Sequence, residues 1–191
     1  MCGRYLFSQT LDQESLDFLE TLEVSEKQSL SLQDVYPSQK TLVLKDPTHY
    51  QVMRWGYQKW DSKQVIINAR TESVHDSPFF KEDLKLRRCI IKASGFYEWD
   101  HDKQKHLIQP KEDEVFYMAG LYTDEKEPRF AILTQASSDE FSQLHHRIPL
   151  MIPKKYLKEY FDMGDQHLKD FTNLKQVPLI IENQSILNRL F

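Results

Sequence analysis

The chain has 191 residues, of which 40% are hydrophobic and 28% charged, and its formal net charge is −4 at pH 7. This length fits a single domain over residues 1–191 with a substantial buried core, and the negative charge excludes binding of nucleic acid through overall basic character. No apolar run approaches the roughly 20 residues of a membrane-spanning helix, so we expect no association with a membrane.

The N-terminal segment lacks the pattern of a secretory signal, because Arg4 interrupts its first apolar residues and Asp12 follows soon after. Only two cysteines are present, Cys2 and Cys89. Without a secretory signal they are expected to be reduced thiols rather than a disulfide. These features favour a cytoplasmic protein, which we expect to be a monomer.

The first predicted strand covers residues 4–7 and would hold Cys2 close to the core. A helix is expected next, because Thr10 and Gln13 have the spacing of a capping box and the leucines that follow recur at helical intervals.

Strands dominate the middle of the chain, where β-branched and aromatic residues form runs of strand length. These runs are residues 41–45, 50–55, 65–69, 89–93, 96–99, 115–122 and 130–135. Regular alternation of strands and helices is absent, as are glycine-rich phosphate-binding motifs, which disfavours a nucleotide-binding α/β fold.

Short helices are predicted at residues 79–86, after Ser138 as a cap, and from Pro153 to residue 161. Pro178 precedes a late strand at residues 179–181. Many strands with few peripheral helices predict an α+β fold, a single domain built on a curled, barrel-like, mainly antiparallel sheet.

A polar segment directly follows the apolar run at residues 65–67. Asn68 at a strand end can hydrogen-bond a substrate oxygen or fix a neighbouring backbone. Arg70 would point to the same face and suits a phosphate, because its planar guanidinium matches two anionic oxygens. The alternative is a turn stabilised by Asn68, with Arg70 and Glu72 as a surface pair.

Glu98 lies between two aromatic residues, Tyr97 and Trp99. Desolvation there would raise the pKa of its carboxyl toward the range of a working general acid or base. By strand alternation Phe96 and Glu98 share one face, while Tyr97 and Trp99 share the other. Glu98 is therefore either a functional residue or a salt-bridged core residue.

Two adjacent histidines, His145 and His146, end a predicted helix and suggest proton transfer, since histidine titrates closest to neutral pH. Exposed capping histidines are the alternative. A metal site is disfavoured, because C-x-x-C and H-x-x-x-H spacings are absent and neighbouring helical side chains point about 100° apart. We predict no metal and no cofactor.

Aromatic and basic residues alternate in the segment R-W-G-Y-Q-K-W at residues 54–60. Single-stranded nucleic acid binds such surfaces by stacking its bases on rings while cations contact its phosphates. Core packing of at least one tryptophan is the alternative. Because the net charge is negative, such binding would need a local basic groove. Its candidate members are Arg4, Arg54, Arg70, Lys85, Arg87, Arg88 and Arg147.

Cys2 would become the N-terminal residue if Met1 were removed, which its small side chain favours. An N-terminal cysteine carries a thiol and an α-amine on one carbon skeleton. The amine condenses with an aldehyde to an imine, and the thiol then closes a five-membered thiazolidine ring. Ordinary pKa values of about 7.7–8.0 for the amine and about 8.5 for the thiol make both reactive near neutral pH. A chance cysteine at this position is the alternative.

Taken together and in this order, these motifs resemble the SRAP family, also called SOS response-associated peptidases or abasic-site processing proteins. The matching text is C-G-R-Y at 2–5, W-G at 55–56, N-A-R-T-E at 68–72, R-C-I-I at 88–91, A-S-G-F-Y-E-W at 93–99, A-G-L-Y at 119–122 and H-H-R-I-P at 145–149. Two positions depart from the family pattern: Ile148 replaces a usual methionine, and Lys92, where proline is common, adds a charge beside the site.

The resemblance implies an α+β fold and covalent capture of abasic sites in single-stranded DNA through Cys2. The active residues it implies are Cys2, Asn68, Glu98 and His145, with His145 chosen over His146 because the family pattern is His-x-Arg-Met-Pro. Arg4, Arg70 and Arg147 match positions that contact DNA phosphates. The predicted base-stacking residues are Trp55, Trp60 and Trp99.

Three functions follow as hypotheses. The first is a crosslinking protein that forms a thiazolidine with an abasic site, with self-removal of Met1 and strand cleavage by β-elimination as further activities. The second is an N-terminal-nucleophile cysteine peptidase or amidohydrolase. The third is a noncatalytic module that binds single-stranded DNA. The first is favoured, chiefly by the resemblance.

Overall fold

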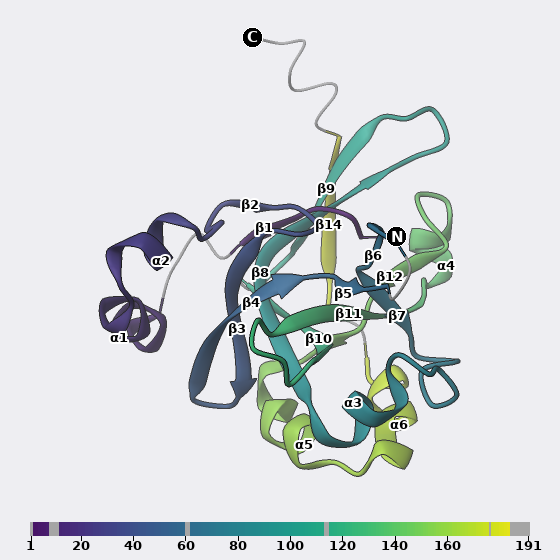
Figure 1. Ribbon diagram of the computed structural model, residues 1–191. Helices are drawn as coiled ribbons and strands as arrows, with labels where there is room; N and C mark the ends of the chain where they lie inside the picture. Colours follow the sequence, from purple (N-terminus) through teal and green to yellow (C-terminus); the bar gives the residue numbers. More distant parts are fainter. Residues whose placement is uncertain (1, 8–11, 60–61, 113–114, 176, 184–191) are drawn as a thin grey trace, which may run out of the picture.

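The structure, a computed structural model, describes residues 2–7, 12–59, 62–112, 115–175 and 177–183. Its centre is a closed ring formed by the strands β3 (Lys40–Asp46), β4 (His49–Trp55), β8 (Arg88–Trp99), β10 (Phe116–Tyr122) and β11 (Arg129–Ala136) (Figure 1). β8 pairs with both β3 and β10, β10 pairs with β11, β11 pairs with β4, and β4 pairs with β3. The β4–β11 pair is parallel and the others are antiparallel, so the predicted barrel-like α+β fold is confirmed as a mixed barrel.

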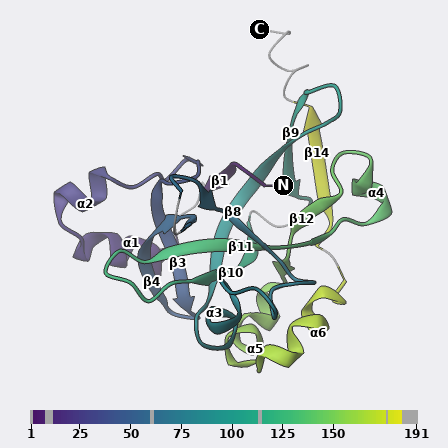
Figure 2. The same cartoon turned by 45° about the vertical axis from the view of Figure 1, so that its right-hand side comes forward.

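One end of β8 extends beyond this ring and carries further strands. β1 (Tyr5–Phe7) pairs with β8 and with β2 (Asp34–Val35). β9 (Lys105–Pro110) returns from β8 as a hairpin and pairs with β14 (Leu179–Asn183). In both views β9 and β14 project beyond the barrel (Figures 1 and 2).

Shorter strands flank β11 and the barrel rim. β7 (Asn68–Arg70) runs parallel to β11, and β12 (Arg147–Pro149) pairs with β11 antiparallel. β13 (Met151–Ile152) pairs with β10, and β5 (Tyr57–Gln58) pairs with β6 (Val65–Ile66).

Short helices lie outside the barrel, with α1 and α2 at one side and α5 and α6 at another (Figure 1). The α-helices are α1 (Gln13–Thr21), α2 (Val24–Gln28), α3 (Lys81–Leu86), α4 (Asp139–Ser142), α5 (Leu157–Asp162) and α6 (Leu168–Thr172), and the 3₁₀ turns are η1 (Lys154–Tyr156) and η2 (Asp165–His167). None of the helices in the described part of the chain has the length and apolar character needed to cross a membrane.

Asp12 caps the first helix, α1, because its side chain accepts a hydrogen bond from the Ser15 backbone N–H at 2.9 Å. The predicted helix is confirmed, with Asp12 as its N-cap, whereas the predicted cap residue Thr10 lies outside the described residues. An aspartate carboxylate satisfies the exposed N–H groups of a first turn and offsets their partial positive charge.

Two of the predicted strands are joined into one. Residues 89–93 and 96–99 belong to β8, which passes through Gly95 without a break. A Cβ at Gly95 would lie 2.8 Å from a Leu107 methyl carbon and 3.1 Å from the Ile108 carbonyl oxygen. Glycine therefore allows β9 to pack tightly against β8. In contrast, the run predicted at 65–69 is split into β6 and β7.

Lys92 does not present its charge to a ligand. It is 8% exposed, and its Nζ lies 2.8 Å from Asp12 Oδ2. The Tyr50 hydroxyl also donates to this carboxylate, at 3.2 Å. The charge that Lys92 adds is therefore engaged in an ion pair with Asp12, which links the start of α1 to β8.

Candidate active site

Cys2 lies three residues before the start of β1 and is completely buried. Its segment is fixed by β1, which pairs with β8, and by the hydrogen bond from the Tyr97 N–H to the Arg4 carbonyl at 2.9 Å. Burial, and then the nearby Glu98 carboxylate, raises the pKa of the Cys2 thiol. The thiol is therefore protonated at neutral pH and needs a base close by to react as a nucleophile.

Asn68, the first residue of β7, forms a hydrogen bond with the backbone of Cys2. It begins β7, which is placed by its parallel register with β11, where Asn68 pairs with Ile132. Its Nδ2 donates to the Cys2 carbonyl oxygen at 3.0 Å. Because a carbonyl only accepts, this contact fixes the orientation of the amide. Asn68 Oδ1 is buried without a hydrogen-bond partner among the described residues, so an acceptor is available for a donor such as an amine.

Glu98 is buried near the end of β8, with 4% of its surface exposed. Burial raises the pKa of its carboxyl to about 7. A group with this pKa exchanges protons readily at neutral pH, as a general acid–base catalyst must. The prediction that desolvation raises the pKa of Glu98 is therefore confirmed.

His145 lies in the loop between α4 and β12, and its Nε2 is 4.0 Å from Glu98 Oε2. Its Nδ1 lies 3.1 Å from the backbone nitrogen and 3.2 Å from the carbonyl oxygen of Arg147, so the Arg147 backbone holds the ring while Nε2 faces the carboxylate. Burial lowers the pKa of His145, which favours the neutral imidazole. The His146 ring stacks on it, with centroids 4.5 Å apart.

These four side chains come from four separate segments, and the fold brings them into contact or close approach. The group combines a buried thiol, an ionisable carboxyl near neutrality, a neutral imidazole and an amide acceptor. Such a set can move protons to and from a nucleophile that attacks a carbonyl carbon. Within the described residues, no three or more His, Cys, Asp or Glu side chains are grouped so as to hold a metal ion.

The sequence model of the family described as SOS response associated peptidase (SRAP) matches residues 1–184 of this chain. The chain belongs to the SRAP family. The abasic site processing protein YoqW of Bacillus subtilis (strain 168) is 30% identical over 184 residues, which cover 85% of this chain and 80% of YoqW. The abasic site processing protein YedK of Escherichia coli (strain K12) is 29% identical over 176 residues, which cover 84% of this chain and 79% of YedK.

Solved structures share the fold of this SRAP protein. The crystal structure of a protein from Bordetella bronchiseptica aligns with a TM-score of 0.78 at 19% identity, covering 95% of this chain and 99% of the other. A protein from Bacteroides thetaiotaomicron aligns with a TM-score of 0.78 at 18% identity, covering 98% and 94% of the two chains. The predicted family and α+β fold are therefore confirmed.

Two of the three tryptophans that are predicted to stack on DNA bases, Trp55 and Trp99, differ in their exposure to solvent. Trp55 has no exposed surface: its ring stacks on Phe130 with centroids 6.2 Å apart, and its Nε1 donates to the Ile67 carbonyl at 3.0 Å. The prediction that Trp55 stacks on bases is therefore wrong, because the ring is part of the barrel core. Trp99 is 42% exposed and can meet a ligand. Trp60 lies outside the described residues.

The arginines predicted to contact DNA phosphates also differ in exposure and in ion pairing. Arg147 is 7% exposed, and its guanidinium makes two hydrogen bonds to Glu72, at 2.7 and 2.9 Å. This carboxylate neutralises it, so the predicted phosphate contact is not supported for Arg147. Arg4 pairs with Asp34 and remains partly exposed, whereas Arg70 is exposed at the end of β7.

Arg4 also lies between the rings of Tyr36 and Tyr97, with its Cζ 4.8 and 4.5 Å from their centroids. Lys105 Nζ lies 4.0 Å from the centroid of the same Tyr97 ring. Cations and aromatic rings thus alternate on this side of β8, as in surfaces that bind single-stranded nucleic acid.

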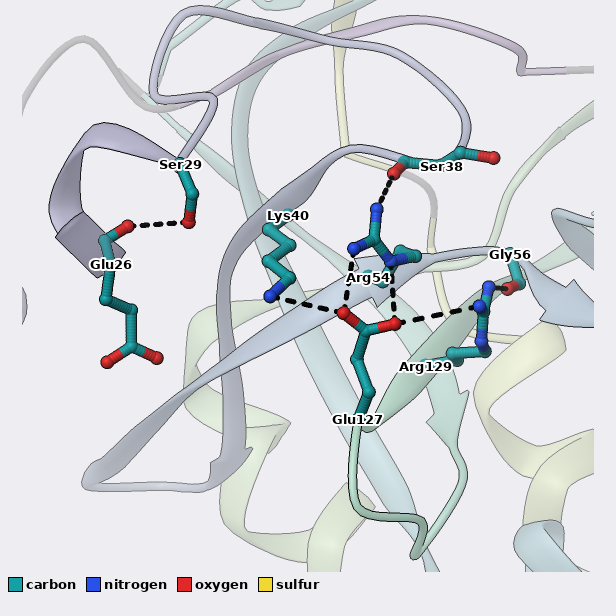
Figure 3. A network of polar contacts seen from close by, with 8 residues as sticks. All are labelled: Glu26, Ser29, Ser38, Lys40, Arg54, Gly56, Glu127 and Arg129. Carbon is teal, nitrogen blue, oxygen red and sulfur yellow. Dashed lines mark hydrogen bonds and ion pairs between the residues drawn. The ribbon is translucent and has the colours of Figure 1, made fainter.

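The remaining members of the suggested basic groove do not gather at this site. Arg54 is held by Glu127, which also pairs with Lys40 and Arg129 (Figure 3). Arg87 pairs with Asp83. The other two are likewise engaged: Arg88 donates to the backbone carbonyls of Leu84, Tyr160 and Phe161, and Lys85 lies 4.0 Å from Asp165. The idea of one continuous groove formed by all these residues is therefore wrong.

Sequence reasoning missed several partners that shape the site. Asp34 pairs with Arg4, and Glu72 pairs with Arg147, whereas the sequence offers Glu72 only as a surface partner of Arg70 in the alternative interpretation of that segment. His106 and Asp100 form a further pair, 2.7 Å apart, across the turn between β8 and β9. The sequence does not predict this pair, because it does not predict β9.

Proposed function

We propose that this protein senses abasic sites in single-stranded DNA and binds them covalently through Cys2 after Met1 is removed. Membership of the SRAP family and the names of the relatives support the substrate. The observation that carries the proposal is the position of Cys2, held by Asn68 at 3.0 Å and adjoining the buried Glu98, whose pKa is raised to about 7.

The chemistry follows from the N-terminal aminothiol. The ring-opened sugar of an abasic site presents an aldehyde at C1′. The α-amine of Cys2 attacks this carbon to give a carbinolamine, which loses water to form an imine. The thiol then adds across the carbon–nitrogen double bond and closes a thiazolidine. One water is released overall, and no oxidant or reductant is required.

Each neighbouring side chain has a role in this sequence. Glu98 takes a proton from the attacking amine and returns it to the leaving hydroxyl group. Asn68 Oδ1 accepts a hydrogen bond from the amine, while Nδ2 keeps the Cys2 backbone in place. His145 promotes opening of the sugar ring by transferring a proton at the ring oxygen. If the imine persists, β-elimination cleaves the strand.

The covalent bond also accounts for binding despite a net charge of −4. Noncovalent contacts need only align the strand briefly, because the bond then holds it. We expect added salt to slow the encounter and to leave the finished crosslink intact.

Mass spectrometry of the digested conjugate tests the chemistry. The mature protein is incubated with an oligonucleotide that carries one abasic site, and the DNA remnant is located on the peptides. We expect it on the Cys2 peptide, with a mass lower by one water than the sum of the reactants. The adduct should survive the digestion without reduction by borohydride, because a thiazolidine resists hydrolysis whereas an imine hydrolyses readily. Attachment at a lysine instead would contradict the proposal.

A second candidate function is peptide cleavage by the same residues, which the peptidase in the family description favours. Met1 would be removed by the chain itself, with Glu98 as the acid–base group. Intact mass of the wild type and of Glu98→Ala, both expressed with normal methionine aminopeptidase, distinguishes the routes. Retention of Met1 only in the variant supports self-cleavage, and equal loss from both proteins contradicts it.

A further inference from the structure

Two exposed aromatic rings lie on the same surface of the protein. Of the phenylalanine, tyrosine and tryptophan side chains in the described ranges, only Tyr36 and Trp99 are exposed, at 41% and 42%. Trp99 belongs to β8, and Tyr36 directly follows β2. An isolated exposed ring needs no explanation, whereas two rings that share a surface with cations suggest a place where a ligand binds.

A row of cations and rings connects these two side chains. The Arg4 guanidinium lies between the rings of Tyr36 and Tyr97. Lys105 lies over the Tyr97 ring and is the direct partner of Trp99 in the antiparallel register of β8 and β9. Direct partners point to the same face of a sheet, and so do Tyr97 and Trp99, which are two residues apart. The row therefore runs from the end of β2, past β1 and β8, to the start of β9.

This row begins next to the nucleophile. The Cys2 thiol donates to the Arg4 carbonyl oxygen, 3.7 Å away. Two residues of extended chain span at most about 7 Å, and successive bases of a stacked strand are about 3.4 Å apart. By strand alternation, Glu98 points to the opposite face of β8 from Tyr97. A nucleotide that neighbours the abasic site, rather than the reacting sugar itself, would therefore meet the row.

Tyr36 offers a ring face to a base, whereas Tyr97 does not. The Tyr97 side chain is buried, and both Arg4 and Lys105 lie over its ring. Within the described part of the chain, Arg4 is the only cation or aromatic ring found against the exposed Tyr36 ring. Because every base has an aromatic face, stacking on Tyr36 would not depend on the sequence next to the abasic site.

A tight turn fixes the position of Tyr36. The Gln39 backbone N–H donates to the Tyr36 carbonyl at 3.1 Å, and the Tyr36 N–H donates to Gln39 Oε1 at 2.9 Å. Pro37 and Ser38 are the central residues, and the φ of 70° at Ser38 is that of the third residue of a type II turn. Only glycine adopts such a φ without strain. Arg54 holds this strained residue in place, because its Nη1 donates to the Ser38 carbonyl at 2.5 Å (Figure 3).

We propose that Tyr36 is a DNA-binding residue that stacks on the base of a nucleotide next to the abasic site, and that Arg54 is a positioning residue that holds its turn. The inference rests on the proposed function, in which the bound partner is a single strand with an abasic site. It assigns to Tyr36 the stacking that the sequence predicts for Trp55, whose ring is buried in the core. The stack orients the strand before the covalent step and takes no part in that step.

The first test uses strands without an aldehyde, so that no covalent step occurs. The fluorescent base 2-aminopurine, which stacking quenches, is placed on the 5′ or the 3′ side of a tetrahydrofuran analogue in two oligonucleotides. We expect the wild type and Tyr36→Phe to quench the probe on one side of the analogue. Tyr36→Leu, which keeps an apolar side chain but no ring, should leave that probe bright and bind about tenfold more weakly. Equal quenching by Tyr36→Leu, or no quenching by the wild type on either side, would overturn the inference.

Tyr156→Leu is the matched control. Lys155 lies 4.8 Å from the centroid of the Tyr156 ring, the same distance as Arg4 from Tyr36. Tyr156 ends η1 directly before α5, well away from β1 and β2 (Figure 1). Its replacement should leave affinity and quenching unchanged. An equal loss in both leucine variants would indicate a general effect on the fold and would overturn the inference.

The second test addresses the turn. Arg54→Met removes the donor to the Ser38 carbonyl and should weaken binding of the analogue strand by about fivefold, the equilibrium equivalent of one strained residue. Adding Ser38→Gly should restore the affinity, because glycine adopts a positive φ without strain. Full affinity of Arg54→Met alone, or no recovery in the double variant, would overturn the positioning role.

Crosslinking of a natural abasic strand by the wild type is measured in parallel. Crosslinking without quenching of the probe overturns this inference and leaves the proposed function standing. Absence of crosslinking refutes the proposed function instead, and the probe still measures whether Tyr36 stacks on a base.

Discussion

His145 Nε2 lies 4.0 Å from Glu98 Oε2, while His145 Nδ1 is held by the backbone N–H of Arg147 at 3.1 Å. An imidazole whose pKa is lowered by burial thus faces a carboxyl whose pKa is raised to about 7. The contact joins the end of β8 to the loop before β12, two segments far apart in the chain. We propose that this contact forms the acid–base part of the candidate active site, next to Cys2 as the nucleophile.

Replacing Glu98 by glutamine should slow crosslinking by about 10²-fold or more, the usual contribution of a general acid–base catalyst. In the wild type the rate should increase as the pH rises through about 7, since the carboxylate is the form that accepts a proton. The variant should lose this step. Single-turnover rates across the pH range measure it, and a step that survives in Glu98→Gln would assign it to another group.

The same substitution should stabilise the protein at alkaline pH. Burial raises the pKa of Glu98 from 4.5 to about 7, so its stabilising contribution is complete below about 4.5 and is lost as the pH rises through about 7. Relative to wild type, Glu98→Gln should gain free energy of unfolding over this window, on the order of 3 kcal/mol at pH 8. Urea denaturation at pH 4.5 and pH 8 measures the difference. A difference independent of pH would refute this assignment.

Substitution of Trp55 should affect mainly the stability of the fold, whereas substitution of Trp99 should affect mainly DNA binding. Trp55→Phe removes the hydrogen bond to the Ile67 carbonyl and part of the packing against Phe130, and should cost about 1–3 kcal/mol of unfolding free energy. Its affinity for intact single-stranded DNA should be unchanged. Trp99→Ala removes an exposed ring and should weaken DNA binding with little effect on stability. Fluorescence anisotropy and chemical denaturation measure both, and the reverse pattern would contradict the placement of Trp55 in the core.

Lys92→Met should loosen α1 without affecting capture. The Lys92–Asp12 contact at 2.8 Å links the start of this helix to β8. Although burial opposes it, the hydrogen bond from Lys92 helps to lower the pKa of Asp12 to about 2. The stabilisation is therefore present above the usual aspartate pKa and is lost as the pH falls through about 2. We expect Tm at pH 7 to fall by about 2–4 °C, with the crosslinking rate unchanged. A large loss of crosslinking would show that Lys92 serves the site after all.

The sequence predicts the barrel strands well, because their apolar runs are long and rich in β-branched and aromatic residues. It does not predict β9, since K-H-L-I-Q-P mixes polar residues and a proline with only two aliphatic ones. β9 is defined by its pairing with β8 and β14, which is a tertiary relationship. The pair of His106 and Asp100 has no sequence signal for the same reason.

At the site, motif order predicts that Cys2, Asn68, Glu98 and His145 act together, and the fold brings them close to one another. Motif order does not assign their partners. Whether a tryptophan stacks on DNA or on Phe130 depends on which strand lies beside it. In the same way, Arg147 has a cationic side chain suited to phosphate, yet Glu72 occupies it with two hydrogen bonds. Burial and pairing of this kind arise from the closure of the barrel and have no local sequence signal.

The most direct test of the central claim is a denaturing gel. Mature protein, with loss of Met1 confirmed by mass, is mixed with a single-stranded oligonucleotide bearing one abasic site, or with a tetrahydrofuran analogue that has no aldehyde. Cys2→Ala and Cys89→Ala are run alongside, the second as the matched control because Cys89 is also a buried thiol. We predict an SDS-resistant band with the wild type and Cys89→Ala on the abasic strand alone, and none with Cys2→Ala. An equal band with Cys2→Ala, or none with any protein, would contradict the account.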